Sequence, residues 1–175
     1  MLFLSLLWIS AAKIVEIQKM EIFFPPADNP YQRIIEIIDK AQDSILLQAY
    51  QLTHVTVTEA LLRAHKRGVK IILLVDKKQA RRFEAPKLFE QGIDVWVDYI
   101  PHIAHNKIMI IDGKTVVGGS FNYSKNALKN AENCIFFENE PQLALEYTRN
   151  FYARLSVSKK LDDYLRMKDT RTSVQ

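Results

Sequence analysis

Residues 44–76 read SILLQAYQLTHVTVTEALLRAHKRGVKIILLVD, and the hydrophobic pattern of this stretch changes twice. Ser44–Leu52 is a largely apolar run that predicts a strand. Thr56–Arg67 has one apolar and one polar face, which predicts a helix that Gly68 ends. Val69–Val75 is a near-continuous run of β-branched residues and leucine, typical of a buried central strand. The stretch therefore predicts a strand, a helix and a second strand.

Further elements extend this pattern on both sides. We expect strands within residues 15–24 and at 93–97 and 133–138, and helices at 31–43, 86–91 and 141–155. Asp112-Gly113, between two apolar runs at 105–111 and 115–119, is a strong hairpin signal. Strand–helix alternation followed by a hairpin predicts a single α/β domain with a mixed β-sheet flanked by helices on both faces. We place this domain at residues 13–155 and expect residues 156–175 to form a polar tail that frays.

The composition is that of a globular protein. Hydrophobic residues make up 48% of the 175 residues and charged residues 25%, which disfavours disorder, collagen and coiled coil. A chain of this length is long enough to bury a core in one domain. Cys134 is the only cysteine, which excludes an intramolecular disulfide and a zinc site with several cysteines.

The chain begins with an apolar leader, MLFLSLLWISAA at residues 1–12. It is shorter than the roughly 20 apolar residues that span a bilayer. It is similar to the apolar region of a secretory signal, with small residues at 10–12, although a basic region before it is missing. As a signal it predicts a periplasmic or secreted protein. A buried first strand or helix and a membrane-tethering stub are the alternatives.

The charge is concentrated in one segment. Between Arg63 and Lys87 lie nine Lys or Arg, opposed only by Asp76 and Glu84, while the whole chain carries +4. Such a segment favours a polyanionic partner, although solvated helix faces can have the same composition. We take Lys77, Lys78, Arg81 and Arg82 as a candidate nucleic-acid track.

Residues 105–122, HNKIMIIDGKTVVGGSFN, combine side chains suited to phosphate chemistry. His105 and Lys107 are two apart, so on a strand they share a face. The lysine can neutralise a phosphoryl oxygen, and the histidine can act as base, acid or nucleophile. Ser120 and Asn122 can present a hydroxyl and an amide to the same oxyanion. Because the predicted hairpin pairs the two strands, we expect these four side chains to converge.

The spacing is His-x-Lys-x4-Asp-x6-Gly-Ser-x-Asn, filled by His105, Lys107, Asp112, Gly119, Ser120 and Asn122. It resembles, at every fixed position, the HKD signature of the phospholipase D superfamily. SILLQAYQLT and ALLRAHKRGVKIILLVD are similar to the strand–helix–strand before the motif in small bacterial nucleases of that superfamily. NAENCIFFEN resembles the segment that carries their additional active-site glutamate, here Glu132. The resemblance implies a phospholipase D-like fold and a single-motif, nuclease-type enzyme.

The resemblance also implies a mechanism. In the superfamily one motif histidine attacks phosphorus to give a phosphohistidine, and a second protonates the leaving oxygen. His105 would be the nucleophile or the acid, and Glu132 would orient an imidazole. The phosphate-binding residues would be Lys107, Ser120 and Asn122. We expect Asp112, although part of the catalytic motif, to fix the hairpin or the motif loop.

A single motif supplies a single motif histidine. The resemblance therefore implies a homodimer whose two motifs face each other across a two-fold axis. His102 is the alternative proton donor within one chain, and a position at the rim of the site suits it better.

A metal centre is disfavoured by the same residues. Two-metal nucleases use clustered carboxylates, whereas only Asp112 and Glu132 lie near the motif and Lys107 would repel a cation. We therefore expect a metal-independent phosphodiesterase without a cofactor, acting on DNA and/or RNA. The alternatives are a phospholipase D-type lipid hydrolase at a membrane, to which the leader could hold the protein, and a nucleic-acid-binding module without turnover.

Overall fold

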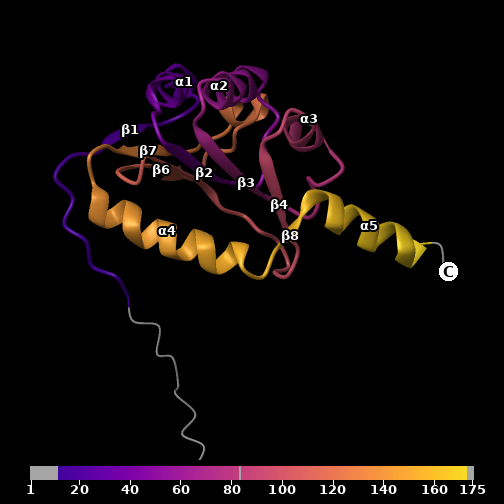
Figure 1. Cartoon of the computed structure of the whole chain (residues 1–175). Coiled ribbons are helices and arrows are strands. Elements are labelled where there is room, and N and C mark those ends of the chain that lie inside the picture. The colour runs from indigo at the N-terminus through magenta and orange to yellow at the C-terminus, as the bar shows by residue number, and fades with distance from the viewer. Residues whose placement is uncertain (1–11, 83, 173–175) are drawn as a thin grey trace, which may run out of the picture.

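The structure, a computed structural model, describes residues 12–82 and 84–172 and is built on one eight-stranded sheet (Figure 1). The strand order is β1-β7-β6-β5-β2-β3-β4-β8. The strands are β1 (Glu21–Phe23), β2 (Ser44–Ala49), β3 (Lys70–Asp76), β4 (Asp94–Asp98), β5 (Lys107–Ile111), β6 (Thr115–Gly119), β7 (Cys134–Phe137) and β8 (Lys159–Lys160). The helices are α1 (Tyr31–Lys40), α2 (Val55–Lys66), α3 (Glu84–Glu90), α4 (Pro141–Leu155) and α5 (Leu161–Thr172), with a short 3-10 helix at Lys125–Lys129.

The sheet is mixed, as the sequence predicts. Strands β2, β3 and β4 run parallel, because helices α2 and α3 return the chain to the same end of the sheet each time. Strand β5 enters antiparallel to β2 and forms the predicted hairpin with β6. Asp112 and Gly113 form its turn with φ of 51° and 62°, the left-handed conformation that such a turn requires.

Helices cover both faces of the sheet. Figure 1 shows α1, α2 and α3 on one face and α4 on the other. Each face therefore needs its own apolar side chains, which explains why the central strands read as continuous apolar runs. The α/β fold with a helix-flanked mixed sheet is thus confirmed.

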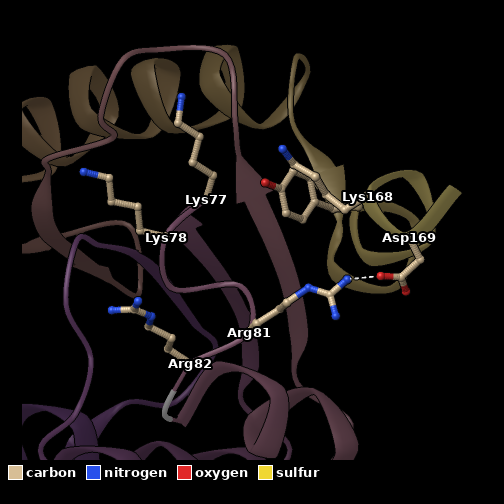
Figure 2. A pocket seen from close by; sticks show the side chains of 7 residues that line it. Lys77, Lys78, Arg81, Arg82, Lys168 and Asp169 are labelled. Carbon is tan, nitrogen blue, oxygen red and sulfur yellow. Dashed lines mark hydrogen bonds and ion pairs between the residues drawn. The ribbon is translucent and has the colours of Figure 1, made fainter. Parts of the chain in front are cut away.

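Residues 157–172 do not form the frayed tail that we expected of residues 156–175. Lys159–Lys160 form the edge strand β8 on β4, and the helix α5 follows at once. Figure 2 shows α5 beside the turn that carries Arg81. Leu161 and Tyr164 anchor the helix, with 1% and 4% of their surfaces exposed. The polar composition of this segment therefore belongs to the outer face of a packed helix.

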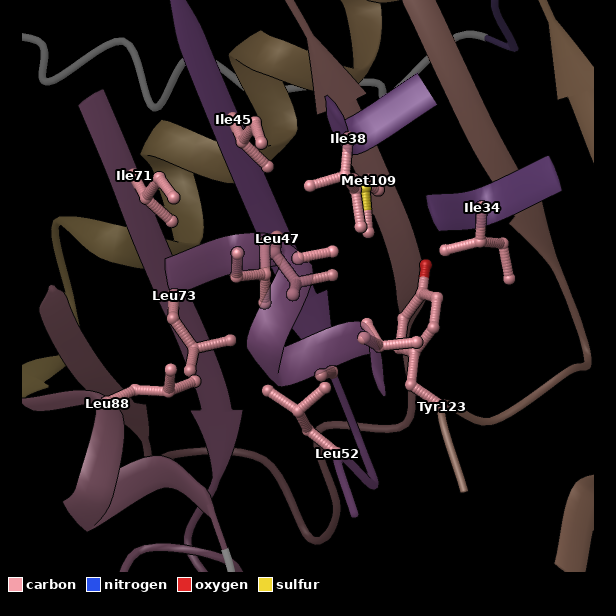
Figure 3. Packing of buried hydrophobic residues seen from close by; sticks show 14 of the residues in the cluster. Ile34, Ile38, Ile45, Leu47, Leu52, Ile71, Leu73, Leu88, Met109 and Tyr123 are labelled. Carbon is pink, nitrogen blue, oxygen red and sulfur yellow. The ribbon is translucent and has the colours of Figure 1, made fainter. Parts of the chain in front are cut away.

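The larger of two hydrophobic clusters lies between the sheet and helices α1 to α3 (Figure 3). It joins Leu47, Leu73 and Met109 from the strands to Ile34 and Ile38 from α1, all of them fully buried. The smaller cluster lies under α4. Burial on this scale contributes roughly 2 kcal/mol for each large aliphatic side chain, so it fixes the strands whose ends carry the site.

The apolar leader lies outside the described residues except for Ala12. In the part of the chain that the structure describes, none of the helices has the length and apolar character needed to cross a membrane.

Candidate active site

The register of the sheet brings the first and last parts of the motif to the same end of the sheet. Ala49 of β2 lies opposite Lys107 of β5, and Gly119 of β6 lies opposite Cys134 of β7. Continuing the pairing of Met109 with Val117 by two residues places Lys107 opposite Gly119. The start of β5, the end of β6 and the start of β7 therefore meet, as the predicted hairpin requires.

His105 and Lys107 form a side-chain pair. Lys107 Nζ lies 2.8 Å from His105 Nδ1 and donates to the His105 backbone oxygen at 2.6 Å. The lysine is buried, with 5% of its surface exposed, whereas the histidine is exposed. Tyr50 supports both: its ring centroid lies 4.2 Å from that of His105 and 5.0 Å from Lys107 Nζ. The His105 ring is thus open to a substrate, while the Lys107 ammonium is held beneath that ring.

Burial shifts the protonation of both groups. It lowers the pKa of Lys107 to about 8, which Glu132 partly opposes. Although the ring is exposed, partial desolvation and the Lys107 charge lower the pKa of His105, and they outweigh the charges of Asp76 and Glu132, which raise it. At neutral pH the lysine is therefore mostly charged and the imidazole mostly neutral. That combination suits an electrophile-binding cation beside a nucleophile.

Ser120 and Glu132 complete the other side of the site. The Ser120 hydroxyl donates to Glu132 Oε2, and Asn130 Nδ2 donates to Oε1 at 3.1 Å. The Asn133 backbone N–H donates to Ser120 Oγ at 3.0 Å, which fixes the hydroxyl. Within one chain the Glu132 carboxylate is therefore held by Ser120 and Asn130, and it acts on His105 through its charge.

Gly119 allows this close approach. Its φ is +127°, and a Cβ placed there would lie 2.4 Å from the Asn133 backbone oxygen. Ser120 N donates to the same oxygen at 3.1 Å. Only glycine has the required conformation and leaves the required space.

Asn122 is held through its backbone, and its side chain is left unpaired. Its carbonyl oxygen accepts from the Tyr31 hydroxyl at 3.2 Å and from Ser124 N at 2.8 Å. Its Oδ1 is buried with no hydrogen-bond partner among the described residues. Because the two ends of an amide can be exchanged by a flip, this position can hold the NH₂ group, a donor for a phosphoryl oxygen.

Asp112 lies at the far end of β5 and does not join the site. Seven residues of extended chain, about 20 Å, separate it from His105. Its carboxylate accepts from the backbone N–H of Gln42, Asp43 and Ser44, at 2.8 Å from Asp43. Its role is to fasten the loop between α1 and β2 to the hairpin turn. These contacts agree with a fixing role for Asp112, and His105 and Lys107 lie at the other end of the hairpin.

Asp76 was not singled out by the sequence, yet it lies next to the site. The residue is fully buried at the end of β3. One carboxylate oxygen accepts from Lys78 N at 2.8 Å, and the other accepts from Ala104 N at 2.7 Å. It therefore fixes the chain immediately before His105. A buried aspartate at the carboxyl end of a parallel strand was the available sequence signal.

The remaining sequence candidates lie elsewhere. His102 is exposed in the loop before β5, which agrees with a place at the rim. Lys77, Lys78, Arg81 and Arg82 lie together on the turn after β3 and line a separate groove. Across the described residues, no group of three or more His, Cys, Asp or Glu is placed to hold a metal ion.

Comparison with known families gives a match over most of the chain. A family model described as cardiolipin synthase, PLD-like domain, matches residues 34–155. The phospholipase D of Rickettsia prowazekii (strain Madrid E) is 42% identical over 140 residues, which cover 78% of this chain and 67% of the relative. That of Rickettsia conorii is 41% identical over 158 residues, covering 86% of this chain and 78% of the relative. The chain thus spans two thirds or more of these two rickettsial proteins.

Solved structures agree with this assignment. Nuc from Salmonella typhimurium, described as a phospholipase D family member, superposes with a TM-score of 0.75 and 28% identity. The match covers 81% of this chain and 97% of Nuc. NucT from Helicobacter pylori has the same TM-score over 81% of this chain and 98% of NucT, at 22% identity, and supports the fold. The family match, the rickettsial relatives and Nuc together show that this chain belongs to the phospholipase D superfamily and is a phosphodiester hydrolase.

Proposed function

We propose that the protein is a metal-independent, sequence-nonspecific endonuclease that cleaves DNA, RNA or both. The observation that carries the proposal is the His105–Lys107 pair, an exposed imidazole 2.8 Å from a buried ammonium. An exposed ring is accessible to a long polymer, and the nearby basic turn favours a polyanion. Nuc, which this chain covers almost completely, supports a small nuclease-type architecture.

His105 forms the covalent intermediate. While Lys107 donates to Nδ1, a neutral ring keeps its proton on Nε2. A phosphoryl oxygen competes for the ammonium, which frees Nδ1 to carry the proton and leaves the Nε2 lone pair for attack. The N–P bond forms as the P–O bond to the leaving oxygen breaks. Lys107, Ser120 and Asn122 neutralise or bind the phosphoryl oxygens.

A second imidazole is required for the leaving oxygen. We assign it to His105 of the partner subunit in a two-fold symmetric dimer, where it donates its proton to that oxygen. The same ring, now neutral, takes a proton from water, whose oxygen attacks phosphorus. The P–N bond breaks and His105 is regenerated. Glu132 stabilises whichever imidazole is cationic, because its charge raises the pKa of His105.

Phospholipid hydrolysis is the second candidate. It is favoured by the names of the rickettsial relatives and by a partly apolar cavity of about 570 Å³ between the segment before β1, β5 and α4. Asn106 and Ile108 line that cavity, so it opens beside the strand that carries Lys107. An acyl chain would fit such a lining. The nuclease assignment is favoured because the basic groove matches a polymer of phosphates.

The deciding experiment is a turnover assay of the purified full chain with excess EDTA. Plasmid DNA, single-stranded DNA, RNA and cardiolipin or phosphatidylcholine vesicles are tested in parallel, with His105→Ala as control. We expect nucleic-acid cleavage that survives EDTA and is absent in the variant. Lipid turnover alone would replace the nuclease by the second candidate, and nucleic-acid binding without turnover would leave only a binding module.

Two further readings test the mechanism. Loss of activity in EDTA would show that the activity requires a metal, and the metal-independent phosphohistidine mechanism would then be wrong. Mixing His105→Ala with wild-type chain should lower activity more than in proportion to dilution, because mixed dimers have one imidazole. A strictly proportional decline, together with a monomer in ultracentrifugation, would exclude the shared site.

A further inference from the structure

A basic groove lies between the turn after β3 and helix α5, outside the site described above. It has a volume of about 750 Å³. It is lined by Lys77, Lys78, Arg81, Arg82, Tyr164 and Lys168, with Asp169 as its one acidic residue. The sequence predicts the first four as a basic track, and α5 adds a second wall that was not expected.

The cations of the turn point in two directions (Figure 2). Arg81 reaches towards α5 and forms an ion pair with Asp169. Lys78 and Arg82 extend away from α5, and neither has a carboxylate partner among the described residues. The backbone of the turn separates the two directions, because Gln79 N donates to the Asp76 backbone oxygen and Arg82 N donates to that of Gln79. One side of the turn thus fastens α5, while the other presents two exposed cations.

The groove is tied to the active site by direct contacts. Asp76 accepts from Lys78 N and, with its other oxygen, from Ala104 N, next to His105. Lys77 Nζ donates to the Pro101 backbone oxygen at 2.7 Å, which fixes the same loop. These contacts therefore hold the turn of the groove and the loop that carries His105 in a fixed relative position. Because one carboxylate bonds both Lys78 N and Ala104 N, the turn lies close to the loop on which His105 sits.

We propose that this groove binds phosphates of the nucleic-acid strand that flank the scissile phosphate. The proposal rests on the proposed function and names where the strand runs. Flexible lysines and exposed arginines suit backbone contacts that tolerate any sequence. Five cations against one carboxylate, itself paired with Arg81, give the groove the charge that a phosphate chain requires.

The central test is the double variant Lys78→Ala/Arg82→Ala in the full chain. We expect KM for a long single-stranded oligonucleotide to rise about tenfold with kcat unchanged, because the reacting groups are untouched. Turnover of bis(p-nitrophenyl) phosphate, which is too small to reach the groove, should not change. The slope of log affinity against log salt should fall by about 2, one for each lost contact. An unchanged KM and slope would overturn the proposal.

Two matched variants sharpen the test. Lys66→Ala/Lys70→Ala removes two exposed lysines of the same basic segment away from the groove, and it should leave KM and the salt slope near the wild-type values. An equal loss in this control would show that only net charge matters. Lys168→Ala should weaken oligonucleotide affinity in the same direction as the double variant, and an unchanged affinity would contradict binding within a groove that α5 helps to line.

Binding is measured separately from turnover so that the two proposals fail independently. Fluorescence anisotropy uses His105→Ala protein, with and without the groove substitutions, and a labelled oligonucleotide. If wild-type protein cleaves no nucleic acid but the groove variant still loses affinity, the nuclease assignment fails and the groove stands. If the groove variant instead loses only binding to cardiolipin vesicles, the groove binds a membrane and the proposal is wrong.

Discussion

The two ends of strand β5 belong to one motif but differ in what their residues do. At the first end His105 is exposed and Lys107 is buried beneath it with a lowered pKa. At the other end Asp112 accepts three backbone N–H groups from the loop before β2. The first end keeps a charge in an unfavourable place, and the second end places a charge where the backbone stabilises it.

The difference shows that one sequence motif can contain both residues suited to chemistry, His105 and Lys107, and a residue that stabilises the fold, Asp112. Burial raises the pKa of the Asp112 carboxyl. The opposing effects are together larger, so the net shift of the pKa is downward: they are the N–H groups of Asp43, Ser44 and Gln42 and the charge of Lys114. A cation with a lowered pKa costs stability, whereas a carboxylate with a lowered pKa contributes to it. Substitutions at the two ends should therefore separate activity from stability.

The largest expected effect comes from substituting one residue at each end of β5 and comparing the two variants. His105→Ala should lower kcat by about a thousandfold or more with an unchanged melting temperature, because the ring is exposed and, in the proposed mechanism, forms the covalent bond. Asp112→Ala should cost about 2 kcal/mol of unfolding free energy, since three N–H groups lose their acceptor. Turnover and urea denaturation are measured on both.

The matched control is Asp112→Asn, which keeps one acceptor oxygen and should recover part of the stability. The advantage of wild type over Asp112→Ala is present above the unfolded-state pKa of aspartate, near 4. It is lost as pH falls through the lowered native pKa. If Asp112→Ala lowered kcat of the folded enzyme as far as His105→Ala does, the division between the two ends would be wrong.

Lys107 should show the opposite relation between activity and stability. Lys107→Met should lower kcat/KM by about a hundredfold, because a phosphoryl oxygen loses its cation. It should also raise the unfolding free energy near neutral pH, by up to about 3 kcal/mol if the whole shift from 10.5 to about 8 is recovered. The measurements are initial rates and urea unfolding.

The stability gain of Lys107→Met and the activity of wild type should both depend on pH in a direction set by the lowered pKa of Lys107. The stability cost of charged Lys107 is full below pH 8 and disappears as pH rises towards the unfolded-state value of 10.5, so the advantage of Lys107→Met should shrink over that range. For wild type, kcat/KM should fall above pH 8 as the ammonium is lost. Lys107→Arg should lack that alkaline decline, and an identical decline in the arginine variant would assign the titration to another group.

Gly119→Ala should act on stability and on the site together. A Cβ 2.4 Å from the Asn133 oxygen forces a shift, and the φ of +127° adds strain, for a cost of about 2 kcal/mol. Because Ser120 follows directly, we also expect a higher KM. Gly118→Ala is the control, since its Cβ would meet only the flexible end of Ile108 at 3.1 Å. Equal effects of the two would show that local strain at 119 is not the cause.

The parts predicted from the sequence are those with a local signal. His105, Lys107 and the Asp112-Gly113 turn lie within a few residues of each other, so strand alternation and turn chemistry place them. Asp76 and Tyr31 were missed because their hydrogen-bond partners are 28 and 91 positions away along the chain, respectively. Local sequence patterns do not predict contacts over such separations.

Helix α5 was missed for a different reason. Leu161, Tyr164 and Leu165 have helical spacing, and Asp162 and Asp163 suit the first turn of a helix. The overall polarity of the segment led to the expectation of a frayed tail, although a narrow apolar stripe is enough for a helix that packs on one side only.

The smallest expected effect concerns a residue that belongs to neither end of β5. The Tyr31 hydroxyl donates to the backbone oxygens of Asn122 at 3.2 Å and of Ser124 at 2.7 Å, so it holds the loop that presents the Asn122 amide. Tyr31→Phe keeps the ring that stacks on His54 at a centroid distance of 3.6 Å and removes only these bonds. It should cost about 1 kcal/mol of stability and raise KM a few-fold at nearly constant kcat.

This positioning role is distinguished from simple packing by comparing substrates and variants. If the loop is displaced, Tyr31→Phe combined with Asn122→Ala should bind substrate no worse than Asn122→Ala alone, because the amide that Tyr31 positions is already absent. Additive losses in KM would instead mean that the hydroxyl acts through the fold as a whole. In the first case, a buried phenol on α1 belongs to the support of the phosphate site, although 91 residues separate it from the asparagine it holds.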